Sequence, residues 1–301
     1  MKIIGAGLSG LIAGVLNESA TIHEPFKQQN SHQALLRFRT PDIGEAVGIP
    51  FREVTAYKGI YYRDSYVPLS NLMMILYSRK VSGRISHRSI RHLAPETRFM
   101  APEGFQDMLR DMCRARIDYE SHIPDVLKQQ GTIVSTIPMN VLADYIGETN
   151  LLCYELDIIK DTRPIFVTRY KVENCDAFMT NYYPGEETAV YRASISGGML
   201  IIESTDPVFS FWSQPVFDSF GILEEEAELI EANYEQRNGK MSLIDEKIRK
   251  AFIVNATLKH NIYSLGRFAV WKDILLDDVY HDIGRIKHFI NLSKYDQLKG
   301  T

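Results

Sequence analysis

The first fourteen residues constrain the fold of this chain more than any other stretch. An apolar segment, Lys2-Ile3-Ile4, leads into a glycine turn and then into a second apolar run. The spacing Gly-x-Gly-x-x-Gly is typical of a strand, tight turn and helix that hold a pyrophosphate. The first glycine permits the turn, the second lets the backbone approach the phosphates, and the third lets the helix pack closely on the strand. The sequence therefore predicts a dinucleotide site, against the alternative of an ordinary strand–turn–helix, at Gly5, Gly7, Leu8, Ser9 and Gly10.

A second strand is predicted over Ala20-Thr21-Ile22-His23-Glu24, and its final carboxylate strengthens the dinucleotide interpretation. In such sites an acidic residue at the end of the second strand holds the ribose hydroxyls. The interval from Gly10 to Glu24 is shorter than usual. The intervening helix must therefore be brief.

Composition limits the class of protein. The chain has 301 residues, 45% of them hydrophobic, and a net charge of -4. It can bury a substantial core, and its charge does not favour wholesale nucleic-acid binding. No apolar run approaches the roughly 18 residues of a membrane span. The three cysteines are an odd number without metal-like spacing, which suits a reducing compartment. The glycine strand begins at the second residue, which argues against a signal peptide before it. We therefore expect a cytoplasmic protein without a membrane segment.

The middle of the chain predicts a second, β-rich domain. A hairpin is expected over 59–68 and a helix over 72–77, and long β-type runs follow between 152 and 203. The apolar strand 132–138 suits a buried parallel strand. Leu223 to Gln236 has apolar residues at helical spacing and predicts an acidic surface helix.

A basic run lies between Arg79 and His92, which contains no acidic residue. One interpretation is a solvated helix face. The other is a surface that contacts phosphates, in which Arg84 and Arg88 would bind substrate. Both interpretations stay open from the sequence.

Several motifs together resemble the flavin amine oxidase superfamily, and most closely a shortened UDP-galactopyranose mutase. The opening glycine motif with Glu24 is one part of this likeness. Further matches are 102–105, the strand 133–138, the Tyr-Pro segment 181–184 before 190–192, and the C-terminal stretch 261–279. The resemblance spans nearly the whole chain.

The resemblance implies FAD as the cofactor, which is favoured over NAD because a second cofactor segment returns near the C-terminus. It implies that Arg192 faces a substrate phosphate, and that Tyr183 and Tyr191 are candidates for catalysis, with aromatic packing in a sheet as the alternative. Arg39 stands where the family has a histidine beside the flavin, so the resemblance makes it a third candidate for catalysis. The C-terminal residues that the resemblance places at the flavin are Gly266, Arg267, Asp277, Asp278 and Val279.

Three departures from the family are visible. The paired glycines after the ribose-binding acid are missing, the histidine position carries Arg39, and much of the helical insertion that holds uridine is absent. The last departure removes the support for the uridine site of a sugar mutase.

The expected fold is α/β, with an FAD-binding Rossmann-like parallel sheet interleaved with an antiparallel substrate domain. FAD-binding parts are placed at 1–36, 101–150 and 256–301, an insertion at 37–100, and the substrate domain at 151–255. The expected function is an FAD-dependent enzyme that oxidises or cleaves a carbon–nitrogen bond. Its substrate would be a phosphate-bearing small molecule or an amino-acid-conjugated pyrimidine in nucleic acid. The alternatives are a mutase-like isomerase that acts on a nucleotide sugar through flavin N5, and a flavin-binding module without turnover.

Overall fold

The computed structural model describes residues 1–27, 36–83, 85, 90–152, 155–160, 163–208 and 210–299. The chain forms two compact units that are interleaved in sequence. Unit 1 comprises Met1–Arg52, Phe99–Asp161 and Met241–Thr301, and unit 2 comprises Glu53–Arg98 and Thr162–Lys240. The units therefore change over at residues 52, 98, 161 and 240, against 36, 100, 150 and 255 in the sequence analysis.

Unit 1 is built on a parallel five-stranded sheet in the order β14-β8-β1-β2-β7. Its strands are β1 (Lys2–Ile4), β2 (Thr21–Glu24), β7 (Ile117–Tyr119), β8 (Ile133–Ser135) and β14 (Ile262–Ser264). Its helices are α1 (Leu8–Val15), α2 (Asp42–Val47), α4 (Phe105–Cys113), α5 (Ile123–Lys128), α6 (Met139–Tyr145), α7 (Glu155–Lys160), α9 (Glu246–His260) and α10 (Leu276–Lys299), with 3-10 turns at Arg114–Arg116 and Thr149–Leu151. A short strand, β3 (Arg37–Phe38), pairs antiparallel with Phe99 and Met100.

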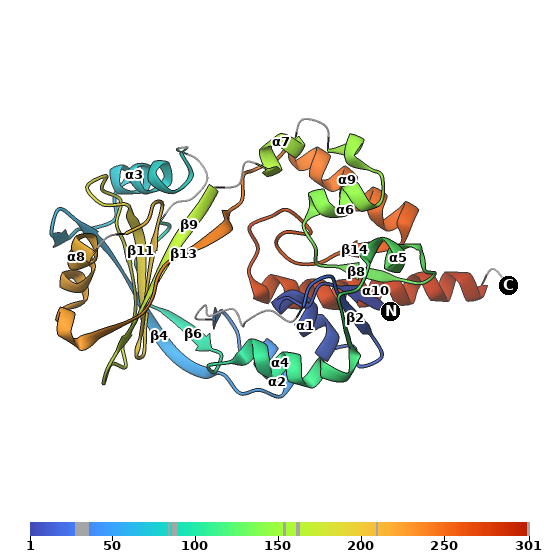
Figure 1. Cartoon of the computed structure of the whole chain (residues 1–301), viewed down its shortest axis with the longest axis horizontal. Coiled ribbons are helices and arrows are strands. Elements are labelled where there is room, and N and C mark those ends of the chain that lie inside the picture. The colour runs from blue at the N-terminus through green and yellow to red at the C-terminus, as the bar shows by residue number, and fades with distance from the viewer. Residues whose placement is uncertain are drawn as a thin grey trace. The chain divides into compact units, whose positions relative to one another are not determined.

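Helices cover both faces of this sheet (Figure 1). Ile3 belongs to the core that α1, α4 and α10 form on one face, whereas Ile4 belongs to the core of α5, α6 and α9 on the other. Successive side chains of a strand point to opposite faces, so a strand that is covered on both sides must be apolar throughout. This is why the first strand reads as a continuous hydrophobic run.

Unit 2 contains a mixed sheet in the order β13-β9-β12-β11-β10-β4-β6, with β5 paired to β4. Its strands are β4 (Arg52–Tyr62), β5 (Ser65–Tyr66), β6 (Glu96–Met100), β9 (Arg163–Val172), β10 (Phe178–Tyr182), β11 (Val190–Ser196), β12 (Met199–Ser204) and β13 (Ala227–Lys240). Helix α3 (Asn71–Ser82) and helix α8 (Ser210–Phe220) accompany the sheet, and a 3-10 turn occupies Glu224–Glu226. The antiparallel character predicted for this domain holds from β13 to β10, but β10 and β4 run parallel.

The predicted acidic helix from Leu223 to Gln236 is wrong. After the 3-10 turn the chain continues as β13, a long strand paired antiparallel with β9 and interrupted by register shifts. Leu229 and Tyr234 are half exposed. The apolar spacing fits a helix by coincidence, because backbone pairing with β9 overrides the local pattern.

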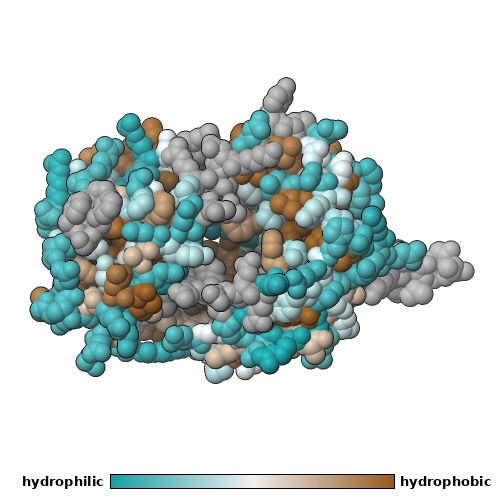
Figure 2. Space-filling view, viewed as in Figure 1, coloured by the Kyte–Doolittle hydropathy of each residue, from teal (hydrophilic) through white to brown (hydrophobic). Residues whose placement is uncertain are grey.

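No helix in the described part of the chain combines the length and apolar character that crossing a bilayer requires. On the face shown in Figure 2, hydrophilic residues dominate the coloured surface and hydrophobic ones occur in small groups. Scattered apolar side chains of this kind are normal on a protein surface.

Candidate cofactor site and substrate sheet

The glycine turn of unit 1 has the geometry that its spacing predicts. Gly5 has a φ of +97°, and a Cβ there would overlap the Thr136 hydroxyl. A Cβ on Gly10 would overlap the Gly5 carbonyl oxygen, so α1 approaches β1 as closely as backbone atoms allow. The predicted brevity of this helix is confirmed, since α1 has eight residues.

Gly7 differs from its two neighbours in the motif. Its φ of -72° is open to any residue, it is exposed, and no described atom lies within 4 Å of the position that its Cβ would take. The fold therefore does not require glycine here. In a glycine turn of this spacing, the second glycine lets the backbone approach a bound pyrophosphate.

Glu24 turns its carboxylate toward the glycine turn. The Ala6 N–H donates to Glu24 Oε2 at 2.6 Å, and the Phe26 N–H donates to Oε1 at 3.2 Å. Each carboxylate oxygen can accept more than one hydrogen bond, so the group can also receive hydroxyl donors. This is the position predicted to hold a ribose.

The C-terminal segment returns to the glycine turn, as the FAD interpretation expects. Gly266 has a φ of +89°, and a Cβ there would lie 2.6 Å from Ser9 Oγ. Arg267 is 3.5 Å from Asp273 and lies over the ring of Phe268. Thus Ser9 and Gly266, both predicted as cofactor residues, lie against each other although 257 positions separate them.

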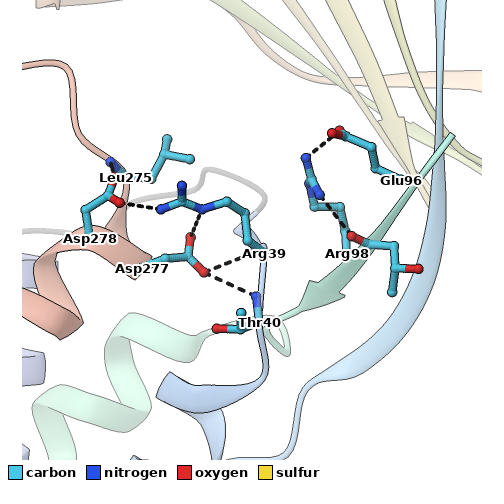
Figure 3. Close-up of polar contacts among 8 residues, drawn as sticks. Arg39, Thr40, Glu96, Arg98, Leu275, Asp277 and Asp278 are labelled. Atoms are coloured by element: carbon cyan, nitrogen blue, oxygen red, sulfur yellow. Dashed lines mark hydrogen bonds and ion pairs between the residues drawn. The ribbon is translucent and has the colours of Figure 1, made fainter. Parts of the chain in front are cut away.

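Arg39, Asp277 and Asp278 are also brought together, at the start of α10 (Figure 3). The buried Asp277 accepts the backbone N–H groups of Arg39 and Thr40 through Oδ1, at 2.9 and 3.3 Å. The Arg39 guanidinium donates to Asp278 Oδ1 at 2.5 Å, and this hydrogen bond raises the pKa of Arg39. The two carboxylates thereby fix the strand end that carries Arg39.

Leu8 and Val279 contribute apolar packing. Val279 is buried in the core beside α1, and its N–H donates to the carbonyl of Leu275, the residue just before α10. Leu8 is half-buried against the same core. In the first turn of each helix, the N–H groups lack an acceptor in the preceding turn, which favours a nearby anion.

In unit 2, Tyr183 and Tyr191 lie in the hydrophobic core. Tyr183 is 3% exposed, its hydroxyl is 2.6 Å from Ser219 Oγ, and burial raises its pKa above the ordinary value. Tyr191 is fully buried and its ring contacts Tyr77 edge-on. Their surroundings favour the packing alternative over a catalytic role.

Arg192 is ion-paired in the sheet. Its guanidinium Nε donates to Glu203 on the neighbouring strand β12. Its charge is therefore already balanced by one carboxylate. The other two predicted substrate arginines, Arg84 and Arg88, lie outside the described residues.

Lys80, a member of the basic run, is not a surface cation. Its ammonium donates to the carbonyls of Tyr183, Gly185 and Val190 at 2.9, 2.5 and 2.6 Å. Burial lowers its pKa from 10.5 to about 8. This lysine holds the loop between β10 and β11, whereas Arg79 and Arg91 are exposed.

Unit 2 also carries a pocket of about 450 Å³ between its sheet and α8. Its lining is mostly apolar and includes Gly59, Tyr66, Met179, Ile195, Ser219 and Phe220. A hydrogen-bonded group lies beside it, because the Asn181 amide donates to the Tyr66 hydroxyl at 2.8 Å and to Ser219 Oγ at 3.1 Å. Sequence analysis did not indicate this pocket, and it also missed Thr136, whose hydroxyl donates to the Ile4 carbonyl under the glycine turn.

The sequence matches no protein-family model and no curated protein. The structure, in contrast, is similar to several solved structures. One is reduced UDP-galactopyranose mutase, with a TM-score of 0.60 and 13% identity over 90% of this chain and 89% of that one. A second is the PF1083 protein from Pyrococcus furiosus, with a TM-score of 0.59 and 11% identity over 97% of both chains.

A third is a CLA-producing fatty acid isomerase from P. acnes, with a TM-score of 0.56 and 12% identity over 96% of this chain and 98% of that one. The chain has the fold of these proteins. The predicted α/β class, with a Rossmann-like parallel sheet and a second β-rich unit, is confirmed. At these identities the likeness concerns the fold alone.

Proposed function

We propose that this chain binds FAD noncovalently and is a flavin-dependent enzyme. The observation that carries the proposal is the glycine turn, where Gly5 and Gly10 are required by the fold but Gly7 borders open space. The return of Gly266 to Ser9 supports FAD over NAD, because it brings a C-terminal segment to the same turn.

The residues present fit the cofactor. The backbone of Gly7, Leu8 and Ser9 at the start of α1 would face the pyrophosphate, and Glu24 would accept the ribose hydroxyls. Arg39, fixed by Asp277 and Asp278, would stand at the flavin end, as the family resemblance suggests. Bound FAD supplies hydride and electron transfer that side chains do not provide. The part of the chain's own residues is to hold and orient cofactor and substrate.

For the reaction, our first hypothesis is oxidation or cleavage of a carbon–nitrogen bond in a phosphate-bearing substrate. The isomerase alternative has one specific support, which is that two of the compared structures are a mutase and an isomerase by name. Redox stoichiometry separates the two. An isomerase needs reduced flavin but consumes no reductant per turnover, whereas an oxidase reduces one acceptor for each product.

The nucleic-acid version of the substrate hypothesis relied on the basic run. Lys80 does not support it, since its ammonium is directed at three backbone carbonyls. Labelled single-stranded DNA titrated at several salt concentrations tests this version. Phosphate contacts predict a log-log slope of about -0.7 per contact, and no binding at low salt would remove the hypothesis.

The test of the cofactor proposal is Gly7→Val. Because the Cβ meets no described atom and φ is ordinary, we expect the free energy of unfolding to change by less than about 0.5 kcal/mol. FAD should nevertheless be lost, since the side chain would occupy the phosphate space. The measurements are urea unfolding and the 450 nm region of the absorption spectrum, in which bound oxidised flavin absorbs.

Gly284→Val is the matched control, because a Cβ at this position on α10 also meets no described atom within 4 Å. This variant should stay yellow. A Gly7→Val protein that is folded and fully loaded with FAD would show that the phosphate loop is assigned wrongly.

A further inference from the structure

A cluster of charges in unit 2 is organised around the carboxylate of Glu96, at the start of β6. The Lys58 ammonium donates to Glu96 Oε2 at 2.5 Å, and Arg98 donates to the same oxygen. His92 Nε2 lies 3.1 Å from Oε1. Figure 3 shows Arg98 directed at Glu96.

The charges in this cluster do not balance. Among the described residues of the cluster, Lys58 and Arg98 carry two positive charges against the single negative charge of Glu96. The side chains of Lys58, Arg98 and Glu96 are only 18%, 24% and 23% exposed. Partly buried surplus charge is costly unless a counter-charge accompanies it.

Other ion pairs on the same sheet are balanced. Arg192 has Glu203 as an ion-pair partner, and Arg169 has Glu231. The Arg192 guanidinium therefore has less capacity for a new anion than the cluster around Glu96. The balance of charges therefore favours Lys58 and Arg98 over Arg192 as the residues of an anion subsite.

The strand register places hydrogen-bonding side chains beside Lys58. Thr180 on β10 pairs with Lys58 on β4 and also with Ser194 on β11. Residues paired in register share one face of a sheet. The Thr180 and Ser194 hydroxyls are 2.9 Å apart, so a row of one cation and two hydroxyls crosses three strands.

We infer that Lys58, Arg98 and His92, held in place by Glu96, form a subsite for the phosphate group of a small-molecule substrate. The inference deepens the proposed function, on which it rests for the assumption that the chain has a substrate. Lys58 and Arg98 leave the cluster with a net charge of +1 against Glu96, which favours the binding of an anion such as a phosphate monoester. Lysine and arginine together supply the point charge and the planar donors that commonly hold phosphate.

The experiment titrates inorganic phosphate into the purified protein and follows the ³¹P line width. Lys58→Met and Arg98→Met should each weaken phosphate binding about tenfold, as expected for one charge-assisted hydrogen bond. Glu96→Gln should tighten binding, because it raises the surplus positive charge by one. Lys171→Met, at an exposed lysine of β9, is the matched control and should have no effect.

Three results would overturn the inference. Phosphate binding could be unchanged in both Lys58→Met and Arg98→Met, Glu96→Gln could weaken it as much as they do, or acetate could bind as tightly as phosphate. Lys58→Gln and Arg98→Gln, checked by circular dichroism, replace any Met variant that does not fold. Gly7→Val removes phosphate binding at the glycine turn and should leave the dependence on Lys58 intact.

FAD content, measured in the same samples, separates the two proposals. If the wild-type protein holds FAD but its phosphate binding does not depend on Lys58 and Arg98, the subsite proposal is wrong and the proposed function stands. If the protein holds no FAD yet phosphate binding depends on Lys58 and Arg98, the cofactor proposal fails and the subsite stands.

Discussion

Gly266 lies against Ser9, so closely that a Cβ on the glycine would be 2.6 Å from the serine Oγ and 3.0 Å from its Cβ. Gly266 also has a φ of +89°. We expect Gly266→Ala to combine backbone strain of about 1 to 2 kcal/mol with an overlap of about 1 kcal/mol or more. The free energy of unfolding, measured in urea, and the fraction of protein that retains FAD should both decline.

Gly48→Ala is the control for strain alone, since Gly48 has a φ of +70° and no described atom within 4 Å of its Cβ position. Gly48→Ala should lower the free energy of unfolding by less than Gly266→Ala does. Adding Ser9→Gly to Gly266→Ala should recover the difference, because it removes the atoms that the new Cβ meets. If the two substitutions change the free energy of unfolding in a strictly additive way, the close contact between Gly266 and Ser9 is contradicted.

Asp278 predicts a pH dependence of stability. Burial acts to raise its pKa, but the Leu275 N–H and the Arg39 guanidinium hold it below the ordinary 3.8. Because the folded-state pKa is depressed, the stabilisation is present above pH 3.8 and is lost as pH falls through the folded value. Asp278→Asn should therefore be less stable than wild type at pH 7, with the difference shrinking below pH 3.8. A difference that is constant with pH would rule out the Arg39 pair.

Tyr183→Phe tests whether the Tyr183 side chain has a structural role in the core or a catalytic role. Ser219 donates its own proton to the Val216 carbonyl, so the Tyr183 hydroxyl is the donor to Ser219 Oγ. Removing it should lower the free energy of unfolding by about 1 kcal/mol and leave the spectrum of bound flavin unchanged. Unchanged stability with an altered flavin spectrum would contradict its placement in the core.

Lys80 should titrate at about pH 8, because burial disfavours its charged form. NMR of the labelled ε-carbon can follow this, with Lys80→Met to assign the signal. Since the unfolded chain keeps its proton to about 10.5, the unfolded state binds more protons between these values. Stability contributed by this group therefore rises with pH from 8 to 10.5. A titration near 10.5 would show that the ammonium is solvated.

The glycine turn could be predicted from sequence because its requirements are local. A positive φ at Gly5 and the contact of Gly10 with the Gly5 carbonyl involve residues a few positions apart. The parallel strands can also be predicted from the sequence, because a strand that is buried on both faces needs an uninterrupted run of apolar residues such as Ile3 and Ile4.

The strand β13 shows where local patterns fail. The spacing of Leu223, Ala227, Ile230 and Tyr234 satisfies a helix, yet the backbone of this segment pairs with β9, about sixty residues earlier. The free energy of that pairing depends on a partner that no local window contains.

Charge shows the same division between sequence and tertiary structure. The sequence determined that the segment 79–92 is basic and that Arg192 lies on a strand, but not which acceptor each cation meets. Only the tertiary structure directs Lys80 at three carbonyls, gives Arg192 a single carboxylate, and surrounds Glu96 with Lys58, His92 and Arg98. The physical reason is that a charge interacts strongly only with groups within a few ångströms, and the packing of α3, β6, β11 and β12 decides which groups these are.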